Sequence, residues 1–263
     1  MRKVMVAMLL ISLATACFEY NPNQIILDDD EKNLTAKNIE RLKAQPAPDT
    51  IVVSFMGDTQ RFYDEADEYV DHLNGVDDVT LVLHGGDISD FGLAKEFGWV
   101  NDIMSDLKVP YLTAVGNHDL LANGKKVYNE MYGPQNYSFE YGNYKFIIID
   151  TNSREYGFNG RVPDIDWLAA ELSDNPADKR VIVVSHISPW NGDFDSDLEM
   201  DYANLLASDP HVVLSLHAHT HSFLDKVYYN DGVRYLVTTS MQKKGYLKLK
   251  LWDDGYSVEQ VNY

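Results

Sequence analysis

The feature that most constrains this chain is a repeated pairing of an apolar run with a short polar cluster. Five such runs are each followed by polar residues, and they cover 51–56, 79–83, 110–115, 181–184 and 211–216. Each run has the length and the β-branched content of a buried strand. Because the carboxyl ends of neighbouring strands converge at one edge of an open α/β sheet, the five clusters are predicted to meet in space.

The residues that would converge are mostly Asp, Asn and His. The clusters read Asp58-Thr59-Gln60, Gly86-Asp87-Ile88-Ser89-Asp90, Gly116-Asn117-His118-Asp119, Ser185-His186 and His217-Ala218-His219-Thr220-His221. Carboxylates that are packed together repel one another strongly unless a cation lies between them. A pair of divalent metal ions is the simplest arrangement that would satisfy this set of side chains.

The order of these motifs resembles that of the calcineurin-like metallophosphoesterase superfamily. The resemblance extends from about residue 50 to about residue 240, and the complete ordered set of motifs is very specific. It implies an α/β fold, a four-layer αββα sandwich of two mixed β-sheets flanked by helices. It also implies a hydrolase of phosphoesters in which a hydroxide that bridges two metal ions attacks phosphorus in line.

The resemblance assigns the metal ligands residue by residue. Asp87 would bridge the two ions. The other ligands fall into two groups, Asp58 and His221 at the first ion, and Asn117, His186 and His219 at the second. Because His219 and His221 are two residues apart, both side chains leave the same side of an extended segment. Imidazole and carboxylate ligands suit Mn, Fe, Zn or Co better than Ca, and the sequence does not choose among these metals.

Gln60 departs from the family pattern, which usually has histidine at this position. A neutral amide oxygen is a weaker ligand for a transition metal than imidazole is. Gln60 is therefore predicted either to be a weak ligand of the first ion or to hydrogen-bond a metal-bound water. It also favours an alternative, a non-catalytic envelope lipoprotein that uses a degenerate site to bind metal or ligand. The retention of His118, Asp90 and Asn117 together argues against that alternative.

By resemblance, His118 would face the leaving-group oxygen as the general acid. Such a histidine needs a partner that holds its charged and correctly oriented form, and Asp90 matches the acidic partner of the family. Asp90 would also suit the N-cap of a helix that begins just after it, and the two roles are compatible. Asp119 completes the motif of His118, but its role is not evident from the sequence.

Two residues near the site are candidate substrate contacts. Trp190 follows the cluster of His186 and would either stack on a base or sugar or lie half buried in its loop. Arg154 follows a strand end and would contact a substrate phosphate, although a surface arginine is the commoner role. His217 precedes the terminal pair of histidines, and a hydrogen-bonded strand residue is its expected role.

The segments between the clusters predict the remaining elements. Apolar residues repeat at helical spacing over 62–73 and 93–107, and again around Trp167 and Leu198. Residues 35–43 are predicted to form a short helix. Two hairpin turns are predicted in the C-terminal third, at Asn230-Asp231-Gly232 and Asp253-Asp254-Gly255. This pattern favours two mixed sheets that lie face to face with helices outside.

Residues 1–16 are predicted to be a signal peptide. A basic pair, Arg2-Lys3, precedes an apolar stretch at 4–13 that is too short to span a bilayer, and Ala14-Thr15-Ala16 resembles a cleavage site. Cys17 is the only cysteine of the chain, and the residues that end with it resemble a bacterial lipoprotein box in which this cysteine carries the lipid. Ordinary secretion is the alternative. The sequence thus predicts export to a bacterial cell envelope.

The rest of the chain is interpreted as a tether and lead-in over 17–49 and one metallophosphoesterase domain over 50–263. The formal net charge of −19 argues against nucleic acid or an anionic membrane surface as a direct partner. Contact with a membrane is expected only through a lipid anchor. The expected substrate is a small-molecule or headgroup phosphoester, and the motifs suit phosphomonoesters and phosphodiesters equally.

Overall fold

The apolar runs become the central strands of two sheets. The computed structural model describes residues 21–175 and 179–263, so the predicted signal peptide and Cys17 lie outside the described residues. In the first sheet, β1 (Ile51–Met56), β2 (Leu81–His84) and β3 (Tyr111–Thr113) are parallel. The sheet has the order β11-β10-β1-β2-β3, and all residues of β1 and β2 are buried, as is typical of strands covered on both faces.

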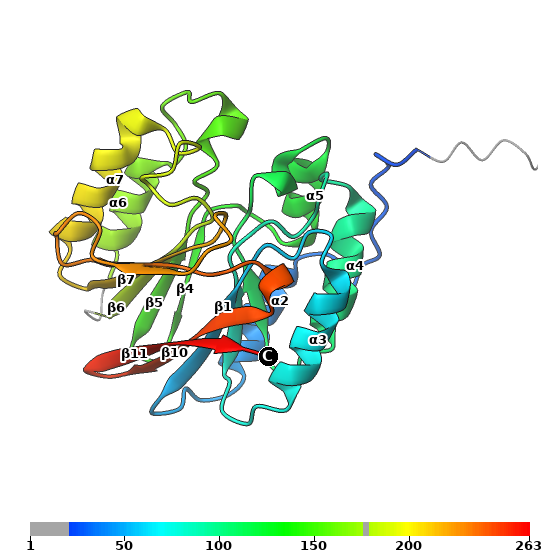
Figure 1. Cartoon of the computed structure of the whole chain (residues 1–263), viewed down its shortest axis with the longest axis horizontal. Helices are drawn as coiled ribbons and strands as arrows, with labels where there is room; N and C mark the ends of the chain where they lie inside the picture. Colours follow the sequence, from blue (N-terminus) through cyan, green and yellow to red (C-terminus); the bar gives the residue numbers. More distant parts are fainter. Residues whose placement is uncertain (1–20, 176–178) are drawn as a thin grey trace, which may run out of the picture.

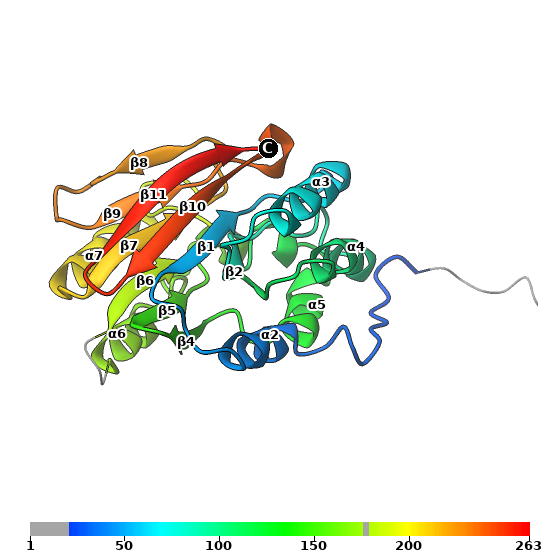
Figure 2. The same cartoon turned by 90° about the horizontal axis from the view of Figure 1, so that it is seen from below.

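The edge of the first sheet comes from the other end of the chain. β10 (Gly245–Trp252) pairs antiparallel with β1, and β11 (Gly255–Asn262) pairs antiparallel with β10. Asp253 and Asp254 form the tight connection between them, as the hairpin signal predicts. Figure 2 shows these C-terminal strands beside β1. The first sheet is therefore complete only when both ends of the fold are present.

The second sheet is also mixed, with the order β4-β5-β6-β7-β9-β8. Its strands are β4 (Tyr137–Tyr141), β5 (Tyr144–Ile148), β6 (Arg180–Val184), β7 (Val212–His217), β8 (Leu224–Lys226) and β9 (Arg234–Val237). Strands β5, β6, β7 and β9 are parallel, and β4 and β8 are antiparallel edges. The residues after β6 and β7 thus leave the sheet at the same edge.

Helices cover the outer faces of both sheets (Figure 1). The helices α3 (Tyr63–Asn74), α4 (Ala94–Ser105) and α5 (Gly124–Met131) pack on the first sheet. The helices α6 (Ile165–Ser173) and α7 (Ser196–Ser208) pack on the second. This confirms the predicted four-layer αββα sandwich. α5 is absent from the predictions, because its sequence offers only Val127, Tyr128 and Met131 as large buried residues.

The apolar core between the sheets fixes their mutual position. Phe55 of β1 and Leu83 of β2 face Phe146 of β5 and Leu216 of β7 in one continuous cluster. At about 25 cal/mol per Å² of buried apolar surface, this layer supplies the main force that holds the two sheets together. Because the layer is buried, the ends of β1, β2, β6 and β7 are held in fixed positions. The polar clusters that directly follow these strands are therefore held in fixed positions as well.

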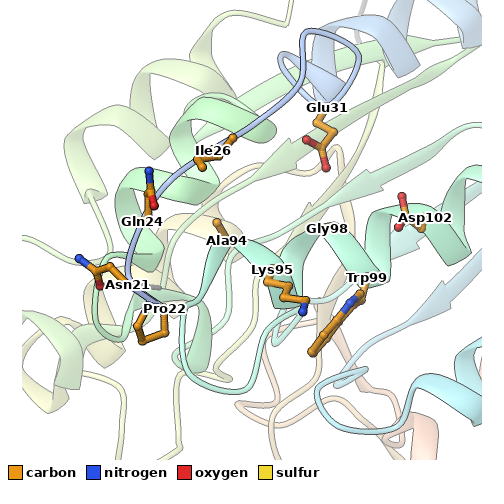
Figure 3. A pocket seen from close by; sticks show the side chains of 10 residues that line it. All are labelled: Asn21, Pro22, Gln24, Ile26, Glu31, Ala94, Lys95, Gly98, Trp99 and Asp102. Atoms are coloured by element: carbon orange, nitrogen blue, oxygen red, sulfur yellow. The ribbon is translucent and has the colours of Figure 1, made fainter. Parts of the chain in front are cut away.

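The lead-in to the first sheet packs against the helices of that sheet. Residues 21–31 run along α4, and the short helix α2 (Leu34–Lys43) then contacts β3 and β4. A pocket of about 580 Å³ lies between this segment and α4, with Ile26 and Trp99 among its lining residues (Figure 3). Within the described residues, no helix has the length and apolar character needed to cross a membrane.

Candidate metal centre

The backbone of the polar clusters turns sharply as the strands end. Four of the predicted ligands have positive φ angles, namely Asp58 (57°), Asp87 (60°), His219 (68°) and His221 (56°). The left-handed conformation costs a residue with a Cβ atom about 1–2 kcal/mol, and such strain is typical of functional sites. The turns bring the two sheets' side chains into one cluster, which has two halves of different character.

We call Asp87, Asn117, His186 and His219 the closed half, because its polar atoms contact one another. Nε2 of His186 lies 3.3 Å from Asp87 Oδ2 and 3.1 Å from Asn117 Oδ1. Nδ1 of His219 lies 3.0 Å from the same Asn117 oxygen. Asp87, His186 and His219 each offer one ligand atom, and these atoms all lie within 4.8 Å of one another. This spacing suits a single metal ion held by three side chains.

A backbone contact sets the direction of the His186 ring. Its Nδ1 donates to the carbonyl oxygen of Gly85 at 2.8 Å, and a carbonyl can only accept. Nδ1 therefore carries the proton, and in the neutral ring the lone pair is on Nε2, which faces the cluster. Burial disfavours the charged ring, but the Asp87 carboxylate outweighs it and raises the pKa of His186 to about 9. The closed half thus attracts positive charge.

We call Asp58, Gln60 and His221 the open half, because its buried oxygens have few partners. Asp58 is fully buried, and neither of its carboxylate oxygens makes a hydrogen bond. Among the described residues its ion-pair partner is the ring of His221, with Nε2 at 3.3 Å from Oδ1. Oε1 of Gln60 is also buried without a hydrogen bond. Buried acceptors without partners are costly in a protein interior, so this group fits a cation.

His118 lies beside the cluster, and its Nδ1 faces the loop of Asp90. Its backbone N–H donates to Asp87 Oδ1 at 2.9 Å, and its Nδ1 donates to the backbone carbonyl of Asp90 at 2.8 Å. The Asp90 carboxylate lies farther away, with Oδ1 at 3.7 Å from the same nitrogen. The predicted partner is thus adjacent to His118, but the contact runs through its carbonyl. The reason is that the carboxylate forms an ion pair with Arg61.

Two interpretations from the sequence can be refined at this loop. Asp90 does not cap the next helix, because α4 begins at Ala94 and Leu93 is its N-cap. Asp119 has a structural role that the sequence did not reveal. Its fully buried carboxylate accepts from the backbone N–H groups of Ser89 and Gly116, each at 2.8 Å. It thereby joins the loop of Asp87 to the loop of Asn117.

Two other buried histidines near the cluster form hydrogen bonds with hydroxyl groups. Nδ1 of His217 lies 3.0 Å from Ser185 Oγ, and its Nε2 lies 2.9 Å from Ser215 Oγ. Nε2 of His84 lies 2.9 Å from Thr59 Oγ1. Burial lowers the pKa of each ring to about 3. Both rings are therefore neutral supports of the site, and His217 is the hydrogen-bonded strand residue that the sequence indicates.

The predicted substrate contacts lie on a loop and a turn that also meet the cluster. Arg154 forms an ion pair with Asp193, whose Oδ2 lies 3.2 Å from Nε2 of His219. Asp193 is thus an acidic neighbour of a predicted ligand, and it is not among the ligands that the motifs predict. Trp190 stacks on Tyr228 with ring centroids 4.1 Å apart and is partly buried. One face of its ring is therefore already covered.

Comparison with known proteins gives consistent results. Residues 51–223 match the family model described as calcineurin-like phosphoesterase. A 3′,5′-cyclic-nucleotide phosphodiesterase of Nostoc is 26% identical over 211 residues, which cover 71% of this chain and 78% of that protein. An uncharacterized protein of Bacillus subtilis, YvnB, is 24% identical over 208 residues, which cover 69% of this chain but 16% of that protein.

Solved structures share the fold at low sequence identity. A dimetal phosphatase from Danio rerio superposes with a TM-score of 0.67 at 14% identity, covering 83% of this chain and 98% of that one. A purple acid phosphatase from yellow lupin superposes with a TM-score of 0.64 at 15% identity, covering 83% of this chain and 52% of that one. At these identities the likeness concerns the arrangement of the two sheets and their helices.

Proposed function

Because the chain belongs to the calcineurin-like phosphoesterase family and is a metal-dependent phosphoester hydrolase, we propose that its site holds two divalent ions and cleaves phosphoesters by in-line attack. One observation carries the proposal. The oxygens of Asp58 and Gln60 are buried without a hydrogen bond among the described residues, in clusters that adjoin the ligand atoms of Asp87, His186 and His219. A single ion in the closed half would leave the buried Asp58 carboxylate with the partly exposed ring of His221 as its counter-charge.

The donors of the site fit both ions. The open half would hold one ion through Asp58, His221 and, more weakly, Gln60, while the closed half would hold the other. By the family resemblance Asp87 would be shared. Its Oδ2 faces His186, and that ring holds its pKa low against the opposing effect of burial. When bound, the ions would acidify a water for attack on phosphorus and neutralise charge on the phosphoryl oxygens. Mn, Fe, Zn and Co are all compatible with these donors.

His118 supplies the proton for the leaving oxygen. Its Nδ1–H is used by the Asp90 carbonyl, so the proton that it transfers must be on Nε2, and the ring acts as an imidazolium. Its side chain is 31% exposed, so a leaving group can reach it from solvent. Such a group contributes most when the leaving alcohol is a poor one.

The substrate class and the location extend this proposal. The name of the Nostoc relative supports phosphodiesters as the first substrates to be tested, while phosphomonoesters use the same machinery. Export and a lipid anchor at Cys17 are supported by the basic, apolar and small-residue pattern of residues 1–17. With a net charge of −19, the chain has no obvious affinity for nucleic acid.

The function can be tested with purified full-length protein. Bound metal would be quantified first, and hydrolysis of phosphomonoesters, diesters and a 3′,5′-cyclic nucleotide would then be measured with Mn, Zn, Co and Fe. We expect hydrolysis that chelation abolishes and metal restores, and loss of it in Asp87→Asn. Protein that binds metal at both halves and hydrolyses none of these esters would contradict the proposal.

The anchor requires a separate measurement. Expression in a bacterial host with a labelled fatty acid should label the native chain and leave Cys17→Ser unlabelled. Because Cys17 lies outside the described residues, this result does not depend on the geometry of the site. A secreted, unlabelled native chain would favour ordinary secretion.

A further inference from the structure

Arg61 is an arginine beside the metal centre that the family motifs do not include. It directly follows Gln60, and its backbone has a φ of 57°, a left-handed conformation that is unfavourable for a residue with a Cβ atom. Its guanidinium forms an ion pair with the carboxylate of Asp90. The side chain is nevertheless 56% exposed. The turn thus holds an exposed cation at the rim of a buried acidic site.

Asp90 connects this cation to the leaving-group acid. Its carboxylate is only 12% exposed and lies 3.7 Å from Nδ1 of His118, beyond hydrogen-bond distance, while its carbonyl accepts from that nitrogen at 2.8 Å. The carboxylate therefore has two basic side chains beside it, those of Arg61 and His118. In the free protein Arg61 holds it, and a small movement would bring it into contact with His118.

We propose that Arg61 is a substrate-binding residue whose guanidinium rests on Asp90 in the free enzyme and moves to the phosphoryl oxygens of the substrate. Guanidinium binds phosphate and carboxylate through the same pair of parallel hydrogen bonds, so the two anions compete for it. Its departure frees the Asp90 carboxylate to bond His118. Substrate binding thereby gives His118, the general acid, the Asp90 carboxylate as its partner. The inference rests on the proposed phosphoesterase function, which supplies the anion.

The negative net charge of the chain makes local cations important for binding a phosphate. A net charge of −19 repels an anionic substrate at long range, so local cations must favour its binding. Arg234 provides a matched control. It also pairs with an aspartate, Asp225, at 2.6 Å, but it belongs to β9. Its side-chain partners within the described part of the chain are Asp225 and Tyr256, and neither belongs to the metal centre.

The experiment measures the affinity of inorganic phosphate for the metal-loaded, full-length protein by titration calorimetry. Arg61→Gln should weaken phosphate binding roughly 10- to 100-fold, the range for a hydrogen bond between charged groups. The phosphate affinity of Arg61→Lys should lie between those of the native protein and Arg61→Gln, because lysine keeps the charge but loses the paired geometry. Asp90→Asn should tighten phosphate binding, because it removes the competing carboxylate. Arg234→Gln should leave the affinity unchanged.

These outcomes separate a binding role from a structural one. A purely structural ion pair predicts a lower melting temperature for Arg61→Gln and Asp90→Asn alike, with phosphate affinity unchanged, and that result would overturn the proposal. Weaker binding in Asp90→Asn would overturn it as well. In steady-state kinetics, Arg61→Gln should raise KM more than it lowers kcat. If the native protein binds phosphate but hydrolyses no ester, the proposed function fails while the calorimetric comparison still decides the role of Arg61.

Discussion

The two halves of the metal centre differ in whether their polar side-chain atoms already have partners. In the closed half, Nε2 of His186 already contacts the side-chain oxygens of Asp87 and Asn117 at 3.1–3.3 Å. In the open half, the oxygens of Asp58 and Gln60 are buried without any hydrogen bond. The closed half is thus stable as a hydrogen-bonded group, while the open half is satisfied only by a cation.

The difference assigns separate tasks to the two halves. A preformed cluster loses little conformational freedom when an ion binds, so the closed half should bind its ion more tightly. The open half has a weak amide donor in Gln60 and a partly exposed histidine, His221, whose side chain is 37% exposed. It should therefore exchange its ion more readily. The following predictions test that contrast.

The most severe test concerns His118, which should belong to neither half. His118→Ala should keep both ions but slow the hydrolysis of alkyl phosphoesters by about 10²–10⁴-fold, the usual contribution of a general acid. Nitrophenyl esters should be affected much less, because their leaving group needs no proton. Parallel kinetics and metal analysis measure both effects. Loss of one ion in the variant would mean that His118 is a ligand and that the division into halves is incomplete.

Metal removal should lower stability in two steps. An ion that binds only the native state stabilises it by mass action, about 2.7 kcal/mol at a free concentration one hundred times Kd. Without the ions, Asp58 and Asp87 are buried carboxylates in one cluster. Increasing chelator should therefore first release the ion of the open half and then that of the closed half, with a fall in melting temperature at each step. A single step would show that the halves are not independent.

Gln60→His should reduce the contrast between the halves. Imidazole is the better ligand for a transition metal, and the usual family pattern has histidine at this position. We expect the affinity of the open half to rise roughly tenfold, at the low end of the changes seen when the surroundings of a metal are altered. Metal content at limiting metal is the measurement. If activity disappears while metal content is unchanged, the Gln60 amide positions a water or the substrate instead.

The smallest expected effect concerns His84, whose ring hydrogen-bonds residues next to the ligands of both halves. His84 accepts from the backbone N–H of Gly86 at 3.1 Å, and burial lowers the pKa of its ring to about 3. The unfolded chain gains a proton near pH 6.5 and the native chain does not, so this ring stabilises the fold above pH 6.5 and loses that contribution as pH falls toward 3. Between pH 7 and pH 6, the loss is about two-thirds of 1 kcal/mol.

His84→Gln should remove that part of the pH dependence. The variant is expected to be less stable at pH 7, and the difference from the native protein should shrink as the pH falls from 7 to 6. Denaturant unfolding at saturating metal measures it. A constant difference across this range would show that the His84 ring is protonated in the folded protein or that its titration does not contribute.

Much of the architecture follows from local sequence. The run at 51–56 forms β1 with the predicted bounds, because a short, mostly apolar run with β-branched residues is typical of a buried strand. The run at 211–216 forms β7 one residue later, at Val212–His217. The convergence of the clusters is likewise predictable, since parallel strands end at the same edge.

The contacts within the site are less predictable, because they depend on backbone turns after the strands end. Nothing in the spacing of Asp90 and His118 shows that the carbonyl and not the carboxylate would be the near partner. That outcome depends on Arg61, whose left-handed backbone directs its side chain to Asp90. The role of Asp119 was hidden for the same reason, since its partners are N–H groups that only a folded loop presents.

The pairing of β1 with β10 determines when the centre can form during protein synthesis. Ile51 pairs with Leu251 and Phe55 with Leu247, so the strand that leads to Asp58 emerges from the ribosome long before its antiparallel neighbour. His219 and His221 also follow both aspartates by more than half the chain. A nascent chain therefore exposes carboxylates that are buried in the folded protein, together with the unpaired edge of β1. Such an edge is prone to pair with the wrong strand. Metal loading that needs the complete first sheet is therefore expected to follow synthesis of the last strand, and C-terminal truncation should yield metal-free protein.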